Sequence, residues 1–179
     1  MPDYIHAFAH EFARQRRLME QALGALSDED FFRRPSAHVN SAALIVKHLA
    51  GNLASRWSDF LTSDGDKPGR NRDAEFVLAP DDTRANLLAA WERAWNIVDA
   101  TLAGLSDADL DRVVTIRGEP HTVQQALIRG VSHAAYHAGQ VLYLARWLAP
   151  EAPYLTIAPG ASRQHGGGRY LQPPRDPPA

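Results

Sequence analysis

Apolar residues recur at spacings of three, four and seven along four stretches of the chain, which is the period of an amphipathic helix. In chain order these stretches contain Ile5, Phe8, Phe12, Met19, Leu23 and Leu26; then Ile45, Leu49, Leu53, Trp57 and Phe60, within about Ser41 to Leu61; then Leu87, Leu88, Trp91, Trp95, Val98 and Leu102; and last a run from about Thr122 to Leu148. No segment alternates apolar and polar residues for long, so the sequence gives little support for strands. We therefore expect an all-α fold, a four-helix bundle in which buried sites form between facing helices.

The fourth predicted helix carries the strongest burial signal. Thr122 and Gln125 have the spacing of a capping box, which satisfies free backbone donors at a helix start. From Val131 to Ala145 there is not one charged residue. Because a helix that is apolar nearly all round is buried, we expect this helix to lie against the other three.

Two segments read as non-helical. Residues 62–76 are rich in Gly, Pro and charge, which predicts a long surface loop between the second and third helices. Seven of the 12 prolines lie in residues 150–179, so a helix there is excluded. We assign residues 1–150 to a helical metal-binding domain and 151–179 to a Pro/Gly-rich C-terminal tail. That tail either stays flexible or lies against the helices or a partner.

Composition excludes several classes of function. The net charge of -2 argues against non-specific nucleic-acid binding, which needs a basic surface. There is no cysteine, so any metal site must use His, Asp or Glu. The charged N-terminus does not resemble a signal peptide, and no apolar stretch is long enough to span a membrane. We therefore expect a cytoplasmic protein without nucleic-acid or membrane partners.

Histidines form two pairs spaced four residues apart, a spacing that places two rings on one helical face. His6 and His10 lie away from the apolar face of their helix, so we expect them in solvent. His133 and His137 lie inside the uncharged fourth helix, where an unpaired polar group costs about 1–3 kcal/mol. They are either core histidines bonded to other side chains or ligands of a metal ion.

His48 favours the metal interpretation. It lies at the edge of the apolar stripe of the second helix, from which it can face the interior of a bundle. By itself it reads as a hydrogen-bonded boundary residue. Together with His133 and His137 it makes a three-imidazole set suited to zinc, nickel, iron or cobalt, with positions left for water or substrate. Ala134 follows His133, so the HExxH pattern with its glutamate base is absent.

Three further residues are candidates for substrate binding or for orienting the ligands. Asn52 lies one turn from His48, and Gln140 shares the face of His133 and His137. His121 stands just before the fourth helix, where a simple helix-start role is the alternative. In contrast, the charged cluster Arg70, Arg72, Asp73 and Glu75 reads as a solvated loop, and the four tryptophans read as core.

Over about residues 1–160 the chain resembles the DinB/YfiT-like superfamily of metal-dependent enzymes. The segments LIVKHLAGN and VSHAAYHAGQVLYLA carry the resemblance. In that family a histidine of the second helix joins an HxxxH of the fourth, which here gives His48, His133 and His137. The resemblance implies an up-up-down-down bundle, a homodimer, and zinc or nickel as the metal. It also implies low-molecular-weight thiols as cosubstrates, since relatives include S-transferases and an isomerase that use them.

These observations lead to two hypotheses. In the first, the chain is a metal-dependent enzyme of hydrolase or S-transferase type, in which the metal activates water or a thiol for a small-molecule substrate. In the second, it is a non-catalytic, metal-stabilised helical interaction module with a closed metal site. A cavity that reaches the three imidazoles would favour the first.

Overall fold

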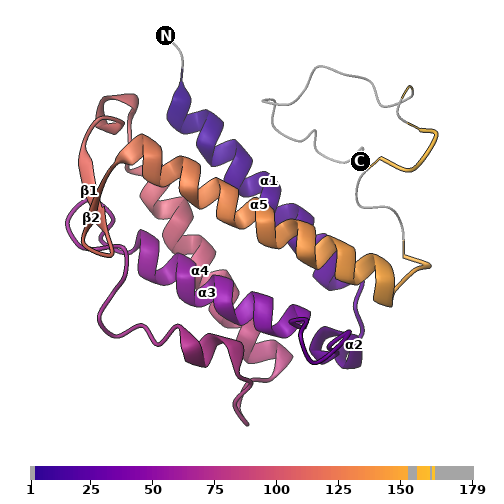
Figure 1. Ribbon diagram of the computed structural model, residues 1–179. Coiled ribbons are helices and arrows are strands. Elements are labelled where there is room, and N and C mark those ends of the chain that lie inside the picture. The colour runs from indigo at the N-terminus through magenta and orange to yellow at the C-terminus, as the bar shows by residue number, and fades with distance from the viewer. Residues whose placement is uncertain (1–2, 153–156, 162, 164–179) are drawn as a thin grey trace.

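The chain is mostly helical with one small two-stranded sheet (Figure 1). The computed structural model describes residues 3–152, 157–161 and 163. The elements are α1 (Tyr4–Gly24), α2 (Asp28–Phe32), α3 (Ala42–Trp57), the 3-10 helix η1 (Asp73–Phe76), α4 (Arg84–Ala103), the 3-10 helix η2 (Asp107–Asp109), β1 (Val113–Ile116), β2 (Glu119–Thr122) and α5 (Val123–Leu148). The four predicted helical stretches correspond to α1, α3, α4 and α5.

The long helices pack chiefly in two pairs, α3 with α4 and α1 with α5. In the first pair the helices are parallel. Thr101 Oγ1, near the end of α4, donates to the carbonyl oxygen of Trp57 at the end of α3 (2.9 Å). Near their starts, Lys47 of α3 forms an ion pair with Asp82 (2.5 Å). Both helices therefore begin at the same end of the molecule.

The other two long helices run the opposite way. The backbone N–H of Tyr4, at the start of α1, donates to Asp107, which follows α4 (3.1 Å). At the far end, Arg84 at the start of α4 donates to the carbonyl oxygen of Leu23 in α1 (2.8 Å). α5 starts beside the sheet, where α3 and α4 end, and runs back along them (Figure 1). α1 and α5 are therefore antiparallel to α3 and α4.

This order of directions corrects one expectation. With α1 taken as up, the four long helices run up, down, down, up rather than up-up-down-down. An up-up-down-down arrangement needs two long crossover connections. This chain has one such crossover, residues 58–83 between α3 and α4. The shorter segment between α1 and α3, and the one between α4 and α5, each join two helix ends that lie at the same end of the molecule.

The β1–β2 hairpin was not expected from the sequence. Its strands pair antiparallel from Val113–Thr122 to Ile116–Glu119. Arg117 and Gly118 make the turn, both with positive φ (57° and 76°), as the tightest hairpins require. With four residues in each strand, the buried–exposed alternation of β1 is too short to stand out in a sequence.

One apolar core joins the four long helices and the hairpin. Phe12 of α1, Trp57 of α3 and Trp95 of α4 are almost fully buried and pack edge to face. Trp91 is also buried, but Trp147 is 53% exposed, so the expectation of four core tryptophans fails at that residue. No described helix is long and apolar enough to cross a membrane. Most of the predicted tail, 151–179, lies outside the described residues.

The 58–83 segment is folded against the helices. The carboxylate of Asp64 accepts hydrogen bonds from the backbone N–H groups of Asp66 (2.7 Å), Arg117 (2.9 Å) and Gly118 (2.8 Å). Those bonds hold the pKa of Asp64 below its usual value. They also fasten the segment to the hairpin turn, so two parts of the chain that are distant in sequence meet beside α3 and α5.

Candidate metal centre

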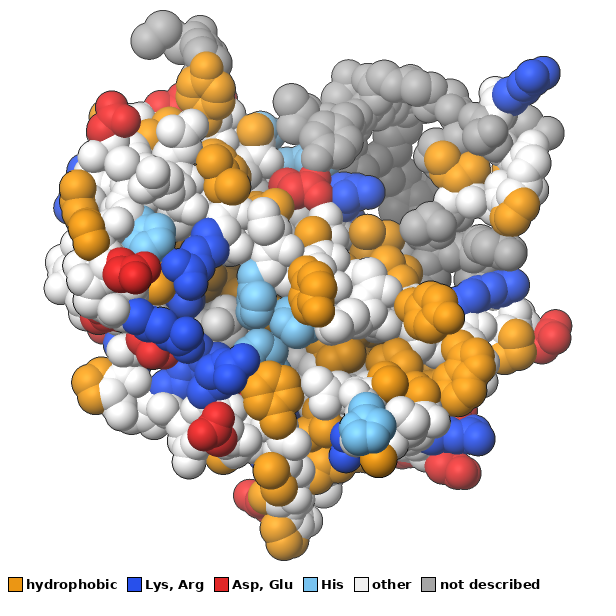
Figure 2. All heavy atoms as spheres, in the orientation of Figure 1, with side chains coloured by type: hydrophobic (Ala, Val, Ile, Leu, Met, Phe, Trp, Pro, Cys, Tyr) orange, Lys and Arg blue, Asp and Glu red, His pale blue; other side chains and the backbone are white. Residues whose placement is uncertain are grey.

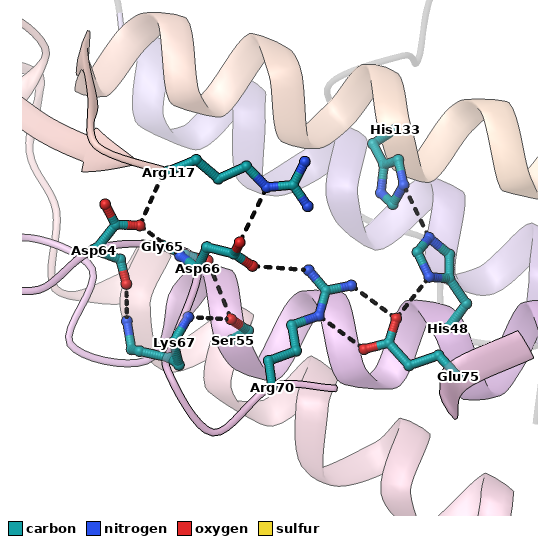
Figure 3. Close-up of polar contacts among 10 residues, drawn as sticks. All are labelled: His48, Ser55, Asp64, Gly65, Asp66, Lys67, Arg70, Glu75, Arg117 and His133. Carbon is teal, nitrogen blue, oxygen red and sulfur yellow. Dashed lines mark hydrogen bonds and ion pairs between the residues drawn. The ribbon is translucent and has the colours of Figure 1, made fainter. Parts of the chain in front are cut away.

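Three histidines from two helices converge between α3 and α5. His133 and His137 are one turn apart on α5, and His48 faces them from α3. The Nε2 atom of His133 lies 3.4 Å from that of His48 and 3.2 Å from that of His137. The structure thus brings together the three residues that the sequence singled out, and Figure 3 shows a ring nitrogen of His133 facing a ring nitrogen of His48.

The spacing of these nitrogens suits one metal ion. A tetrahedral ion held at about 2.1 Å by imidazole nitrogens places them about 3.4 Å apart. The two Nε2 separations match that value, and one ligand atom of each histidine lies within 4.8 Å of the others. Within the described residues, no Asp, Glu or Cys joins this group. The described residues therefore offer three ligand atoms to an ion, one fewer than a closed tetrahedral site has.

Hydrogen bonds on the outer side of two rings fix their tautomers. Nδ1 of His48 lies 2.8 Å from Oε2 of Glu75, and Nδ1 of His137 lies 2.8 Å from Oε1 of Gln140. Since a carboxylate or amide oxygen only accepts, each Nδ1 carries the proton. The lone pair of each Nε2 then points inward. This arrangement is typical of metal-ligating histidines and fits a metal ion at the centre.

Burial keeps the α5 histidines neutral. Burial, together with the neighbouring His137 and His48, lowers the pKa of His133 to about 3. Burial lowers the pKa of His137 to about 4, although its hydrogen bond to Gln140 acts in the opposite direction. Because a metal ion competes with protons for imidazole nitrogen, neutral rings at pH 7 are the form that ligation needs.

Glu75 is the site residue that sequence reasoning missed. It was expected in a solvated loop, yet η1 brings it against α3, where it is 6% exposed. Burial raises the pKa of its carboxyl, but hydrogen bonds from His48 and Arg70 and the charge of Arg70 outweigh this and leave the pKa lowered. Arg70 forms two bonds to the carboxylate, both 2.8 Å long (Figure 3). The sequence feature that matches this position is Gly51 of α3, whose lack of a side chain leaves room for Glu75.

Aromatic rings pack against two of the three histidines. Phe76, the residue after Glu75, stacks on His48 with ring centroids 4.7 Å apart. Tyr136 packs edge to face with His137 at 5.2 Å. Two residues of η1 therefore contact His48, Glu75 through its carboxylate and Phe76 through its ring. Together they limit the orientations that this imidazole can adopt.

A cavity of about 200 Å³ reaches the site from one side. His48 and His133 line it, as does the predicted residue Asn52. Five arginines complete most of the wall: Arg56, Arg70, Arg72, Arg117 and Arg129. In Figure 2 histidine side chains reach the surface beside a group of basic side chains.

The other predicted residues lie farther from the cavity. Gln140 orients His137 and lines a separate surface pocket. His121 does not line the arginine-rich cavity, but its Nε2 lies 3.1 Å from Nη1 of Arg129, which does. His6 is exposed and His10 is partly exposed, and neither belongs to a metal-ligating group among the described residues.

The 58–83 segment and the hairpin turn contribute Arg70, Arg72 and Arg117 to the wall of this cavity. Asp66 lies between two arginines, at 3.1 Å from Nε of Arg117 and 3.6 Å from Nη1 of Arg70. Arg70 in turn binds Glu75, which binds His48 (Figure 3). A continuous series of polar contacts therefore connects the hairpin turn to His48.

Comparison with known proteins gives a family and a fold. The model of a family described as "Protein of unknown function (DUF1572)" matches residues 1–161. The fold is similar to that of a structure described as "Crystal structure of the conserved protein of locus from Enterococcus faecalis", with a TM-score of 0.63 and 16% identity. That match covers 85% of this chain and 100% of the other. No curated protein matches the chain.

Proposed function

The chain belongs to the DUF1572 family of proteins of unknown function, and from its site we propose that it is a metal-dependent enzyme. In this proposal His48, His133 and His137 hold one divalent transition-metal ion, zinc or nickel. When bound, the ion supplies a Lewis acid that lowers the pKa of a water molecule or a low-molecular-weight thiol. The reaction is then hydrolysis or S-transfer on a small molecule.

The observation that carries the proposal is the cavity at the histidines. Structural metal sites are closed by four protein ligands, whereas catalytic sites keep a position open to water or substrate. Here the described residues supply three ligands, and a cavity is lined by two of them, His48 and His133. This arrangement favours an enzyme over the non-catalytic interaction module.

The chain's own residues preset the site. Glu75 and Gln140 hold protons at Nδ1 of His48 and His137, so that both Nε2 lone pairs face inward. Arg70 keeps Glu75 ionised and fixed in position. Such outer partners raise the basicity of the ligands and hold their geometry before substrate arrives.

We also propose that the four long helices form a bundle of the DinB/YfiT type, in which they run up, down, down, up and not in the order that the resemblance implied. A single core shared by these helices supports this, as does a histidine from the second long helix facing an HxxxH of the fourth. In this reading low-molecular-weight thiols are candidate cosubstrates and the protein forms a homodimer.

The first test is the metal content of the purified full-length protein, measured by elemental analysis. We expect one transition-metal ion per chain, and loss of that ion in His48→Ala, His133→Ala and His137→Ala, with helical content retained in circular dichroism. His121→Ala is the matched control, since it removes a histidine outside the cluster. Metal retained in all three cluster variants would exclude the site.

The second test distinguishes an enzyme from a module. In cobalt-substituted protein, added azide or a small thiol should change the visible spectrum, because the ion has an open position. Screening with thiol cosubstrates and with esters then separates S-transfer from hydrolysis. A closed tetrahedral spectrum that none of these ligands changes would favour the structural module.

A further inference from the structure

Positive charge is concentrated in the cavity beside the histidines. Its five arginines come from four parts of the chain, namely α3, the 58–83 segment, the hairpin turn and α5. They are Arg56, Arg70, Arg72, Arg117 and Arg129. The chain as a whole has a net charge of -2, so this concentration is not a consequence of general basicity.

Neighbouring carboxylates balance only part of that charge. Arg70 is paired with Glu75, and Arg117 with Asp66. The other three arginines make no ion pair within the described part of the chain: Arg56, Arg72 and Arg129. Guanidinium groups crowded without counter-charges repel one another, and an anion placed among them would relieve that repulsion.

Arg56 is the clearest case. It is only 8% exposed, and its Nε is buried without a hydrogen-bond partner among the described residues. Burial, together with the charges of Arg129, Arg70 and Arg117, lowers its pKa to about 10. A buried, unpaired charge is costly unless something pairs with it.

We propose that this cavity binds the anionic group, a carboxylate or a phosphate, of a small substrate whose reactive group lies at the three histidines. The inference rests on the proposed function and names the substrate class for that site. Arg56, Arg72 and Arg129 bind the anion, while Arg70 and Arg117 stay paired with Glu75 and Asp66.

Both geometry and size support a small oxyanion. The planar guanidinium presents its donors in a fork that matches carboxylate and phosphate oxygens. The cavity, at about 200 Å³, is smaller than the roughly 300–1,000 Å³ of drug-sized ligand pockets. Because His48 and His133 line the same cavity, a molecule bound there by its anionic end is held against the histidines.

Isothermal titration of the full-length protein, as purified, with inorganic phosphate and separately with malonate tests the proposal. At roughly 50 mM salt, where screening is weak, we expect saturable binding of one anion per chain. Binding of phosphate alone assigns a phosphate substrate, binding of malonate alone assigns a carboxylate, and binding of both supports a general oxyanion site. Neutral malonamide should not bind, and absence of binding by both anions overturns the proposal.

Arginine variants locate the site. Arg56→Met and Arg129→Met should each weaken binding about tenfold or more, as expected for loss of a charge-assisted hydrogen bond. Arg93→Met, at an exposed position of α4, makes the same change in net charge away from the cavity and should leave binding unchanged. If Arg56→Met does not fold, Arg72→Met takes its place. Equal weakening in the Arg93 variant would show non-specific attraction and overturn the proposal.

Anion binding by metal-free protein distinguishes failure of this proposal from failure of the proposed function. Protein that has been treated with a chelator, which is then removed, should still bind phosphate or malonate through its arginines, and so should His137→Ala. Anion binding without any metal binding would reject the metal-dependent enzyme and keep the anion site. Metal binding without anion binding would do the reverse.

Discussion

Glu75 accepts a hydrogen bond from Nδ1 of His48 at 2.8 Å, across 27 residues of sequence. The contact sets the tautomer of His48 and directs its Nε2 toward the two histidines of α5. Arg70 holds the same carboxylate by two bonds, so the long connection between α3 and α4 is part of the site.

Glu75→Gln should weaken metal binding about 10–100-fold, because a neutral amide, which lacks the charge that binds Arg70, supports and orients His48 less strongly than the carboxylate does. It should also lower the free energy of unfolding by about 1–3 kcal/mol, since buried Arg70 loses its charged partner. Competition with a chromophoric chelator measures the first effect, and urea unfolding measures the second. Asp73→Asn, an exposed change in the same 3-10 helix, is the control. Equal affinity in the two variants would contradict the orienting role.

Gly51→Ala should disturb the same contact from the other side. A Cβ at residue 51 would lie 2.2 Å from Oε1 and 2.8 Å from Cδ of Glu75, so the carboxylate must move. We expect metal affinity to fall about 10–100-fold, as it does when a residue that orients a metal ligand is lost. Gly24→Ala, where an added Cβ meets nothing within 4 Å, should leave affinity unchanged. A folded Gly51→Ala protein with normal affinity would show that Glu75 can retreat without consequence.

The stability of the metal-free protein should fall as the pH drops below about 6.5. His133 and His137 have folded-state pKa values of about 3 and about 4, against an ordinary value of 6.5. Between these values the unfolded chain binds protons that the folded chain does not, so a lower pH favours unfolding. Urea midpoints at about pH 7.5 and about pH 5 measure the loss. The double variant His133→Ala, His137→Ala should show a smaller loss, and an equal loss would assign the effect to other groups.

Gly130→Ala should destabilise the helix packing by about 1–3 kcal/mol. An added Cβ would lie 2.6 Å from Cζ2 of Trp57 and 2.9 Å from Cζ of Phe12, and both rings are buried in the core. Gly139→Ala on the same helix meets open space and should stabilise the protein by up to about 1 kcal/mol. Denaturant unfolding of the two variants should therefore shift in opposite directions, and a shift in the same direction would refute the close contact at Gly130.

Association as a homodimer stays a prediction, based on the family resemblance. Sedimentation velocity of the full-length protein at micromolar concentration should give a single species of twice the chain mass. A monomer across that range would reject the homodimer. Repeating the measurement on a chain that ends at Pro159 asks whether the C-terminal tail contributes to association.

Local pattern was enough to predict the long helices and, on the last of them, two of the three histidines at the site. Apolar periodicity located α1, α3, α4 and α5, and the capping box at Thr122 is formed by hydrogen bonds with Gln125 in both directions. The i, i+4 pair on an uncharged helix identified His133 and His137. These signals are local, because a helix repeats its faces every few residues and needs no distant partner to do so.

Tertiary structure decided the rest. The single long connection set the helix directions, and its fold against α3 turned Glu75 from an expected surface charge into a buried partner of His48. The arginine cavity likewise combines Arg56, Arg117 and Arg129 from segments far apart in sequence. In a sequence, each charged residue considered by itself is predicted to be exposed to solvent. Their burial becomes favourable only when the folded chain supplies a counter-charge or a ligand does, and sequence spacing does not encode that pairing.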